Sequence, residues 1–132
     1  MKKTLWRAAN DDYVDTGYSF AETRDVAEAY LDNPGFGGAQ LFRTRLSVEP
    51  DQILDWTGMT LRRAARAVGL SDPGAIGLDE WLPRTPAALD ALREQGFLWV
   101  LVAESFPYDT TTWIWLGTSD DEEPELEPWD PA

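Results

Sequence analysis

Two apolar runs in the last third of the chain restrict its fold more than any other feature. The first is FLWVLVAE, residues 97–104, and the second is TTWIWLG, residues 111–117. Both have the length of a β-strand and are rich in aromatic or β-branched residues, and the first is apolar almost throughout, which is typical of a strand buried on both faces. Only the segment SFPYDT separates them. The simplest arrangement is therefore an antiparallel hairpin at the centre of a sheet.

Two helices are predicted from the signals at their ends. Residues 85–96, TPAALDALREQG, have threonine at the N-cap, proline at the first helical position and glycine just beyond the last turn. Residues 60–70, TLRRAARAVGL, place leucine, alanine and valine on one face and arginines on the other, and Gly69 marks the end. Residues 71–83 are expected to form a loop with one extra helical turn.

The first half of the chain contains two further strand candidates. Residues 3–9, KTLWRAA, form a short apolar run, and the turn-rich segment DDYVDTG follows them. Residues 39–48, AQLFRTRLSV, alternate so that Phe42 and Leu46 share one side and the two arginines share the other. The next segment, EPDQILDW, is expected to leave this strand or to form a short edge strand.

The segment GYSFAETRDVAEAYLDNPGFGG, residues 17–38, contains the signals of a complete surface helix. Ser19 and Glu22 match the capping box, in which each side chain accepts a hydrogen bond from the other residue's backbone N–H. A helix is therefore predicted to begin at Ser19, with NPG at 33–35 as its end. The glycines of GFGG at 35–38 indicate a turn, and they would also allow the backbone to approach a ligand.

The elements do not alternate regularly between strand and helix, and the chain has no internal repeat. We therefore expect a compact α+β domain over residues 1–117, with about three helices packed on small, mainly antiparallel sheets. The remaining residues, 118–132, hold seven carboxylates and no basic side chain. This acidic tail is predicted to be disordered, with Leu126 and Trp129 as its only anchors.

Charge and composition exclude several classes of function. The formal net charge is −13, which disfavours direct binding to nucleic acid. The chain has no cysteine and no histidine, so it has no disulfide, no thiolate metal site and no ordinary nucleophile–base pair. No run approaches the roughly 20 apolar residues that span a bilayer. The first residues turn polar too early for a signal peptide, so a cytoplasmic protein is expected.

The order of three sequence elements resembles the small mono-ADP-ribosyltransferase-like proteins. These elements are LWRA, then GYSFAETRDVAEAYLDNP, then LREQGFLWVLV with a final hairpin strand, and the resemblance covers about residues 4–116. It implies that the chain binds NAD and transfers ADP-ribose to a protein or nucleic-acid target, as a bacterial or phage toxin or anti-defence factor would. It also implies that Arg7 binds the ribose or phosphates, that Ser19 positions the ribose, and that Phe20 and Tyr30 complete the cofactor site.

The chemistry of such a site requires a carboxylate as well as the arginine. Arginine donates two parallel hydrogen bonds to a phosphate, and a carboxylate beside the ribose stabilises the oxocarbenium-like state in which nicotinamide leaves. In the family the last functional strand supplies a glutamate, but the corresponding position here falls near Thr112. Asp109 in the preceding loop and Glu104 at the end of the preceding strand are the candidate replacements.

A second hypothesis is a non-catalytic protein-binding module or inhibitor whose acidic tail attracts a basic surface of a partner. In that case the NAD chemistry was lost with the glutamate, and Trp129 is a candidate anchor for the partner. The residues of the predicted site also have structural explanations. These are an exposed strand position for Arg7, the helix cap for Ser19, core packing for Tyr30, and solvated loop carboxylates for Asp109 and Glu104.

Overall fold

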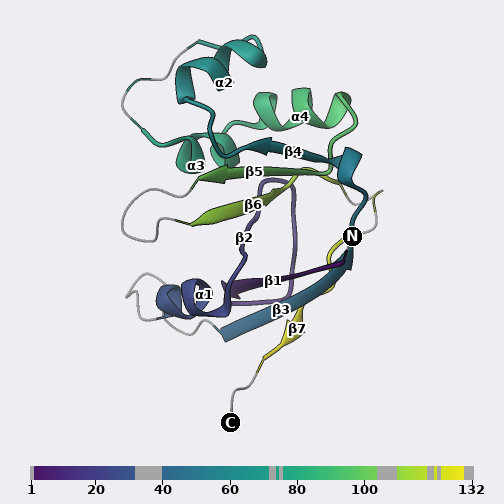
Figure 1. Cartoon of the computed structure of the whole chain (residues 1–132). Helices are drawn as coiled ribbons and strands as arrows, with labels where there is room; N and C mark the ends of the chain where they lie inside the picture. Colours follow the sequence, from purple (N-terminus) through teal and green to yellow (C-terminus); the bar gives the residue numbers. More distant parts are fainter. Residues whose placement is uncertain are drawn as a thin grey trace.

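The computed structural model describes residues 2–31, 40–71, 74, 76–103, 110–118, 121 and 123–129. Within these residues one seven-stranded sheet has the order β4-β5-β6-β2-β1-β3-β7, and four α-helices pack on it (Figure 1). The strands are β1 (Lys2–Ala9), β2 (Ser19–Ala21), β3 (Gln40–Ser47), β4 (Ile53–Trp56), β5 (Trp99–Ala103), β6 (Thr111–Trp115) and β7 (Glu127–Pro128). The helices are α1 (Arg24–Leu31), α2 (Leu61–Ala67), α3 (Leu78–Trp81) and α4 (Pro86–Glu94).

The predicted α+β class and the predicted hairpin are both confirmed. β5 and β6 pair antiparallel from Trp99–Trp115 to Ala103–Thr111. The edge strand β4 runs parallel to β5, and the other described pairs are antiparallel. The predicted helices at 85–96 and 60–70 correspond to α4 and α2, and the Thr60 hydroxyl caps α2 by accepting a hydrogen bond from the Arg63 N–H at 3.2 Å.

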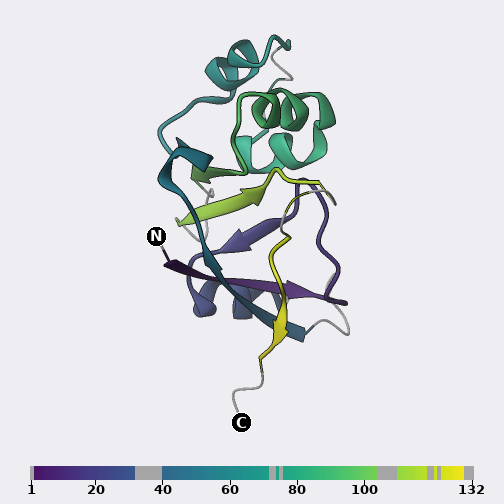
Figure 2. The ribbon, with the colours of Figure 1, turned by 90° about the vertical axis from the view of Figure 1, so that its right-hand side faces the viewer.

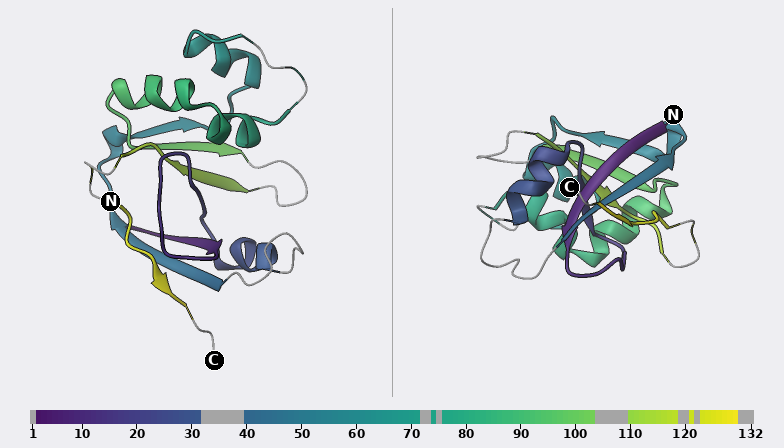
Figure 3. Two further views of the ribbon diagram at one scale, coloured as in Figure 1. Left: turned by 180° about the vertical axis from the view of Figure 1, so that it is seen from behind. Right: turned by 90° about the horizontal axis from the view of Figure 1, so that it is seen from below.

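The sheet is strongly bent, so that β4, β5 and β6 face β1 and β3 across an interior (Figures 1 and 3). We call the side of the sheet that lines this interior the inner face. Side chains from both halves fill it, namely Leu5, Phe20, Val48, Trp99, Trp113 and Trp115, together with Val14. These residues hold the two halves of the sheet together.

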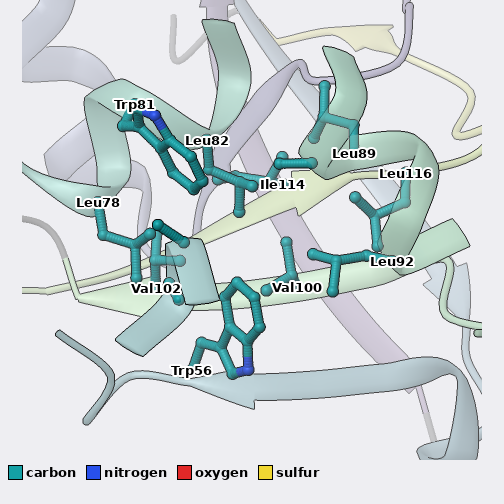
Figure 4. Close-up of a cluster of buried hydrophobic side chains, with 13 residues drawn as sticks. Trp56, Leu78, Trp81, Leu82, Leu89, Leu92, Val100, Val102, Ile114 and Leu116 are labelled. Atoms are coloured by element: carbon teal, nitrogen blue, oxygen red, sulfur yellow. The ribbon is translucent and has the colours of Figure 1, made fainter. Parts of the chain in front are cut away.

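Two other clusters cover the opposite side of the sheet, which we call the outer face. Helices α2, α3 and α4 pack over β4, β5 and β6, where Trp56, Trp81, Val100 and Ile114 are buried (Figure 4). Helix α1 lies over the other half of the sheet and buries Ala27 against Ala21 and Leu41 (Figure 3). β5 therefore has buried side chains on both faces, as its apolar run predicts.

The prediction of a helix beginning at Ser19 is wrong. Residues Ser19–Ala21 form β2, which pairs with β6 through Phe20 and Trp113, and the helix begins only at Arg24. Burial of Phe20, which is 2% exposed, requires the extended backbone. The Thr23 hydroxyl accepts a hydrogen bond from the Val26 N–H at 3.4 Å, so it replaces Ser19 at the helix start. The predicted end at 33–35 and the GFGG turn lie outside the described residues.

The prediction of a disordered tail is wrong for the segment that contains β7. Glu127 pairs with Arg43 of β3, and the Trp129 N–H donates to the Leu41 carbonyl at 2.9 Å, so β7 extends the sheet (Figure 2). The Trp129 ring lies 5.3 Å from the Trp6 ring and 4.7 Å from the Arg43 guanidinium. Aromatic packing and two ion pairs therefore hold this segment against its negative charge.

The attachment of β7 is expected to depend on pH. The Glu127 carboxylate accepts hydrogen bonds from Arg43 at 3.1 Å and from Arg45 at 3.2 Å, and these bonds hold the pKa of Glu127 below its usual range. A carboxylate with a lowered pKa stabilises the fold at neutral pH, and this contribution is lost as the pH falls through the pKa of the folded state. The protection factor of the Trp129 amide, which is its exchange rate corrected for the intrinsic pH dependence of exchange, should therefore fall in acid, and Glu127→Gln should remove most of this change. Protection factors with the same pH profile in both proteins would contradict the role of Glu127.

Candidate functional site

The strands that carry the predicted site are neighbours in the sheet. The resemblance implies one site built from the first strand, the second strand and a late strand, and these correspond to β1, β2 and β6. β2 lies between the other two, with Ala21 opposite Trp6 on one side and opposite Thr112 on the other. Residues far apart in the sequence are thereby brought onto neighbouring strands, and the face that each side chain occupies decides which of them can meet.

Arg7 lies on the inner face of β1 and contacts β2. Its Nη1 donates a hydrogen bond to the Ser19 carbonyl at 2.8 Å, and its guanidinium lies 4.4 Å from the Tyr18 ring. Burial lowers the pKa of Arg7, whereas Tyr18 and Asp11 act in the opposite direction. Arginine remains charged in proteins. The Arg7 Nε is buried and has no hydrogen-bond partner among the described residues, so part of its donor capacity is unused.

Ser19 meets Arg7 through its backbone and not through its hydroxyl. Ser19 pairs with Ile114, and directly paired residues of antiparallel strands share a face. Ile114 belongs to the cluster under α2, α3 and α4, so the Ser19 side chain lies on the outer face. The carbonyl of Ser19 fixes the Arg7 guanidinium, while the hydroxyl lies on the other side of the sheet.

The two aromatic residues of the predicted cofactor site occupy different environments. Phe20 is in the core of the inner face, beside Trp99, with ring centroids 5.5 Å apart. Its ring centroid lies 5.8 Å from the Arg7 guanidinium carbon, so the two side chains are neighbours on the inner face. Tyr30 is half-buried on α1, and α1 packs on the outer face. The sheet therefore separates α1 from Arg7.

The position expected to hold the family's glutamate faces away from Arg7. Thr112 is 7% exposed, and its neighbours Trp113 and Thr111 lie on the opposite, inner face because side chains alternate along a strand. A glutamate at 112 would thus point to the outer face. The two candidate replacements, Glu104 and Asp109, lie outside the described residues.

Two inner-face residues, Tyr18 and Glu22, were not among the predicted site residues. Tyr18 stacks under Arg7, and Glu22 accepts a hydrogen bond from the Trp113 indole at 2.7 Å. The signal that would identify them is the alternation of Tyr18, Phe20 and Glu22, which places all three on one face once residues 19–21 are taken as a strand. The capping-box pattern at Ser19 and Glu22 predicts a helix over the same residues instead.

A separate open groove of about 580 Å³ lies where β1 and β3 meet near their Lys2 and Ser47 ends. None of the predicted site residues contributes to it. Its lining residues are Lys2, Lys3, Thr4, Arg45, Leu46, Ser47 and Glu127. The Glu127 carboxylate already forms an ion pair with the Arg45 guanidinium at 3.2 Å, so much of the groove's basic charge is compensated within the chain.

Comparison of the chain with protein-family models, curated proteins and solved structures gave no match. In the described part of the chain, no three histidine, cysteine, aspartate or glutamate side chains are grouped closely enough to hold a metal ion. No helix among the described residues is long and apolar enough to cross a membrane.

Proposed function

We propose that this protein is a cytoplasmic ADP-ribosyltransferase-like domain that binds NAD beside Arg7 and transfers ADP-ribose to a macromolecular target. One observation carries the proposal: Arg7 of β1 contacts Ser19 of β2 at 2.8 Å, and β2 in turn pairs with β6. The resemblance derives three separate site groups from these same strands. Adjacency of these strands supports a shared site, but only Arg7 and the Ser19 carbonyl meet in it, because the Ser19 hydroxyl and position 112 lie on the outer face.

The chemistry of Arg7 suits the pyrophosphate of a dinucleotide. The Ser19 carbonyl and the Tyr18 ring hold the guanidinium in one orientation, so little side-chain freedom remains to be lost on binding. Its Nε is buried without a partner among the described residues, so a phosphate would have to be bound through the terminal nitrogens of the guanidinium. A charged arginine in a partly desolvated site binds an anion more strongly than an exposed one does. Tyr18 adds an aromatic surface beside the same site.

The acidic binding module receives less support from the contacts of the tail. Glu127 pairs with Arg43 and Arg45, and Trp129 packs on Trp6. These two residues are engaged within the chain, so neither is available to a partner unless β7 detaches. A macromolecular target remains part of the proposal, because ADP-ribose transfer needs an acceptor.

The proposal is tested by calorimetric titration with NAD. The full chain should bind NAD, and Arg7→Lys should weaken binding by about tenfold or more, because lysine keeps the charge but cannot make two parallel hydrogen bonds. Arg63→Lys is the matched control, since Arg63 is exposed on α2. Absence of heat at millimolar NAD, or equal affinities of the full chain and Arg7→Lys, would contradict the proposal.

A further inference from the structure

Strand β3 is paired along only part of one edge. β1 pairs with all eight residues of β3, whereas β7 pairs only with residues 42–43. The Leu41 carbonyl accepts a hydrogen bond from Trp129 on the β7 side, and the backbone groups of alternate residues in a strand point to the same edge. The backbone N–H and C=O groups of Arg45 and Ser47 therefore point to that edge too, and no described residue pairs with them there.

The groove of about 580 Å³ that Arg45 and Ser47 help to line keeps an excess of positive charge. Arg43 and Arg45 share the single Glu127 carboxylate, so one positive charge of this group is not balanced. Lys2 is exposed and has no ion pair within the described residues. The Arg45 side chain is 64% exposed, so a ligand has access to it. The formal net charge of the chain is −13, so the local charge at this edge is opposite to that of the chain as a whole.

The chain's own tail shows which pattern of side chains fits beside β3. Glu127 lies on the outer face, where it pairs with the two arginines, and Leu126 packs in the inner cluster. The same alternation continues along the free edge, because Arg45 is exposed on the outer face and Leu46 packs with the inner cluster. A strand in which acidic and apolar residues alternate would therefore match both faces of this edge.

The charge of the edge disfavours two other occupants. A second copy paired through the same edge would bring the basic side chains of both chains together, and like charges across paired strands are destabilising. A nucleic acid would match the local charge, but it would leave the backbone groups of the edge unpaired, and the net charge of the chain repels a long polyanion. A protein strand that carries carboxylates satisfies both the charge and the backbone groups.

We infer that the free edge of β3 at Arg45 and Ser47 docks an extended acidic segment of a partner protein, which adds a strand to the sheet. The backbone of that segment pairs with Arg45 and Ser47, and its carboxylates lie over Arg45 and over Lys2, which is paired with Ser47 across β1 and β3. In this mode of recognition, main-chain hydrogen bonds provide affinity and side-chain contacts provide specificity. Arg7 does not line the groove, so the inference is independent of NAD binding.

The probe is a fluorescein-labelled peptide of about eight residues in which glutamate and valine alternate. Its binding to the full chain is followed by fluorescence anisotropy in about 0.15 M salt, where charges more than about 8 Å from the peptide are largely screened. Ser47→Pro removes the backbone N–H that faces the free edge, so it should weaken binding by about tenfold. Proline is tolerated on an edge strand where the N–H faces solvent, so this variant should fold, as circular dichroism would show.

A second variant tests the charge without altering the backbone. Lys2→Gln should weaken binding of the peptide by about threefold, because one exposed ion pair is lost. Arg66→Gln is the matched control, since Arg66 is exposed on α2 and its replacement changes the net charge equally. Its affinity for the peptide should equal that of the full chain. Arg7→Lys should also bind the peptide as the full chain does.

Three results would overturn the inference. The first is absence of binding at millimolar peptide. The second is equal affinity of the full chain, Ser47→Pro and Lys2→Gln, which would place the peptide elsewhere on the molecule. The third is tighter binding of an oligothymidylate of similar length than of the peptide, which would make the edge a nucleic-acid site. A peptide in which lysine replaces glutamate should not bind, and binding of both peptides alike would contradict recognition of acidic side chains.

Discussion

Replacement of Trp99 by alanine is expected to lower the free energy of unfolding by about 4 kcal/mol. Trp99 is 3% exposed and joins the two halves of the bent sheet. Its ring lies 5.5 Å from Phe20, 5.7 Å from Trp113 and 5.0 Å from Trp115, measured between centroids. Alanine would leave a cavity that three rigid aromatic rings cannot easily close, so the loss should exceed that of an aliphatic truncation.

Urea denaturation followed by far-ultraviolet circular dichroism measures this effect. Tyr13→Ala is the matched control, because Tyr13 is 59% exposed and its removal should change the free energy by less than about 0.5 kcal/mol. Similar midpoints for Trp99→Ala and Tyr13→Ala would show that the aromatic cluster does not hold the two halves of the sheet together.

Truncation after Gly117 is the second large change, with an expected loss of about 3 kcal/mol in the free energy of unfolding. It removes Leu126 from the inner cluster and Trp129 from its contacts with Trp6 and Arg43, and it leaves one edge of β3 unpaired. If the tail served only to attract a basic partner through its charge, its removal would leave the free energy of unfolding of residues 1–117 unchanged.

Thermal unfolding of the truncated and full chains distinguishes these outcomes. Trp129→Ala should reproduce a substantial part of the loss, since the ring contributes both an edge-to-face contact and a cation–π contact. Glu125→Gln is the control for charge alone, because Glu125 is exposed. Equal transition temperatures of the truncated and full chains would mean that β7 adds nothing to the sheet.

The elements that the sequence predicts correctly are those whose signals are local. Helix α4 has a proline at its start and a glycine beyond its end, and the hairpin strands are apolar and closely spaced. The sequence does not predict β2, because its strand conformation depends on the pairing of Phe20 with Trp113, 93 residues further along the chain. A capping box is a local pattern, and tertiary contacts override such patterns when a large side chain must be buried.

The difference between local patterns and long-range pairing also explains which residues of the candidate site the sequence could indicate. The resemblance in the order of elements implies Arg7 and Ser19, and the structure brings Arg7 into contact with the Ser19 carbonyl but leaves the Ser19 hydroxyl on the opposite face. Tyr18 and Glu22 join them only through the β1–β2 and β2–β6 pairings, which no single segment specifies. β7 has only two residues and lies in a strongly acidic segment, so neither periodicity nor composition indicates a strand there.

The most direct test of the proposed NAD site is a titration of the ¹⁵N-labelled full chain with NAD, followed by amide chemical shifts. We expect the largest changes at Arg7 and at Tyr18, whose ring lies 4.4 Å from the Arg7 guanidinium. Amides of α2 and α4, which lie on the outer face, should change little. Unchanged spectra at millimolar NAD, or changes confined to the groove formed by Lys2, Lys3 and Arg45, would contradict an NAD site beside Arg7.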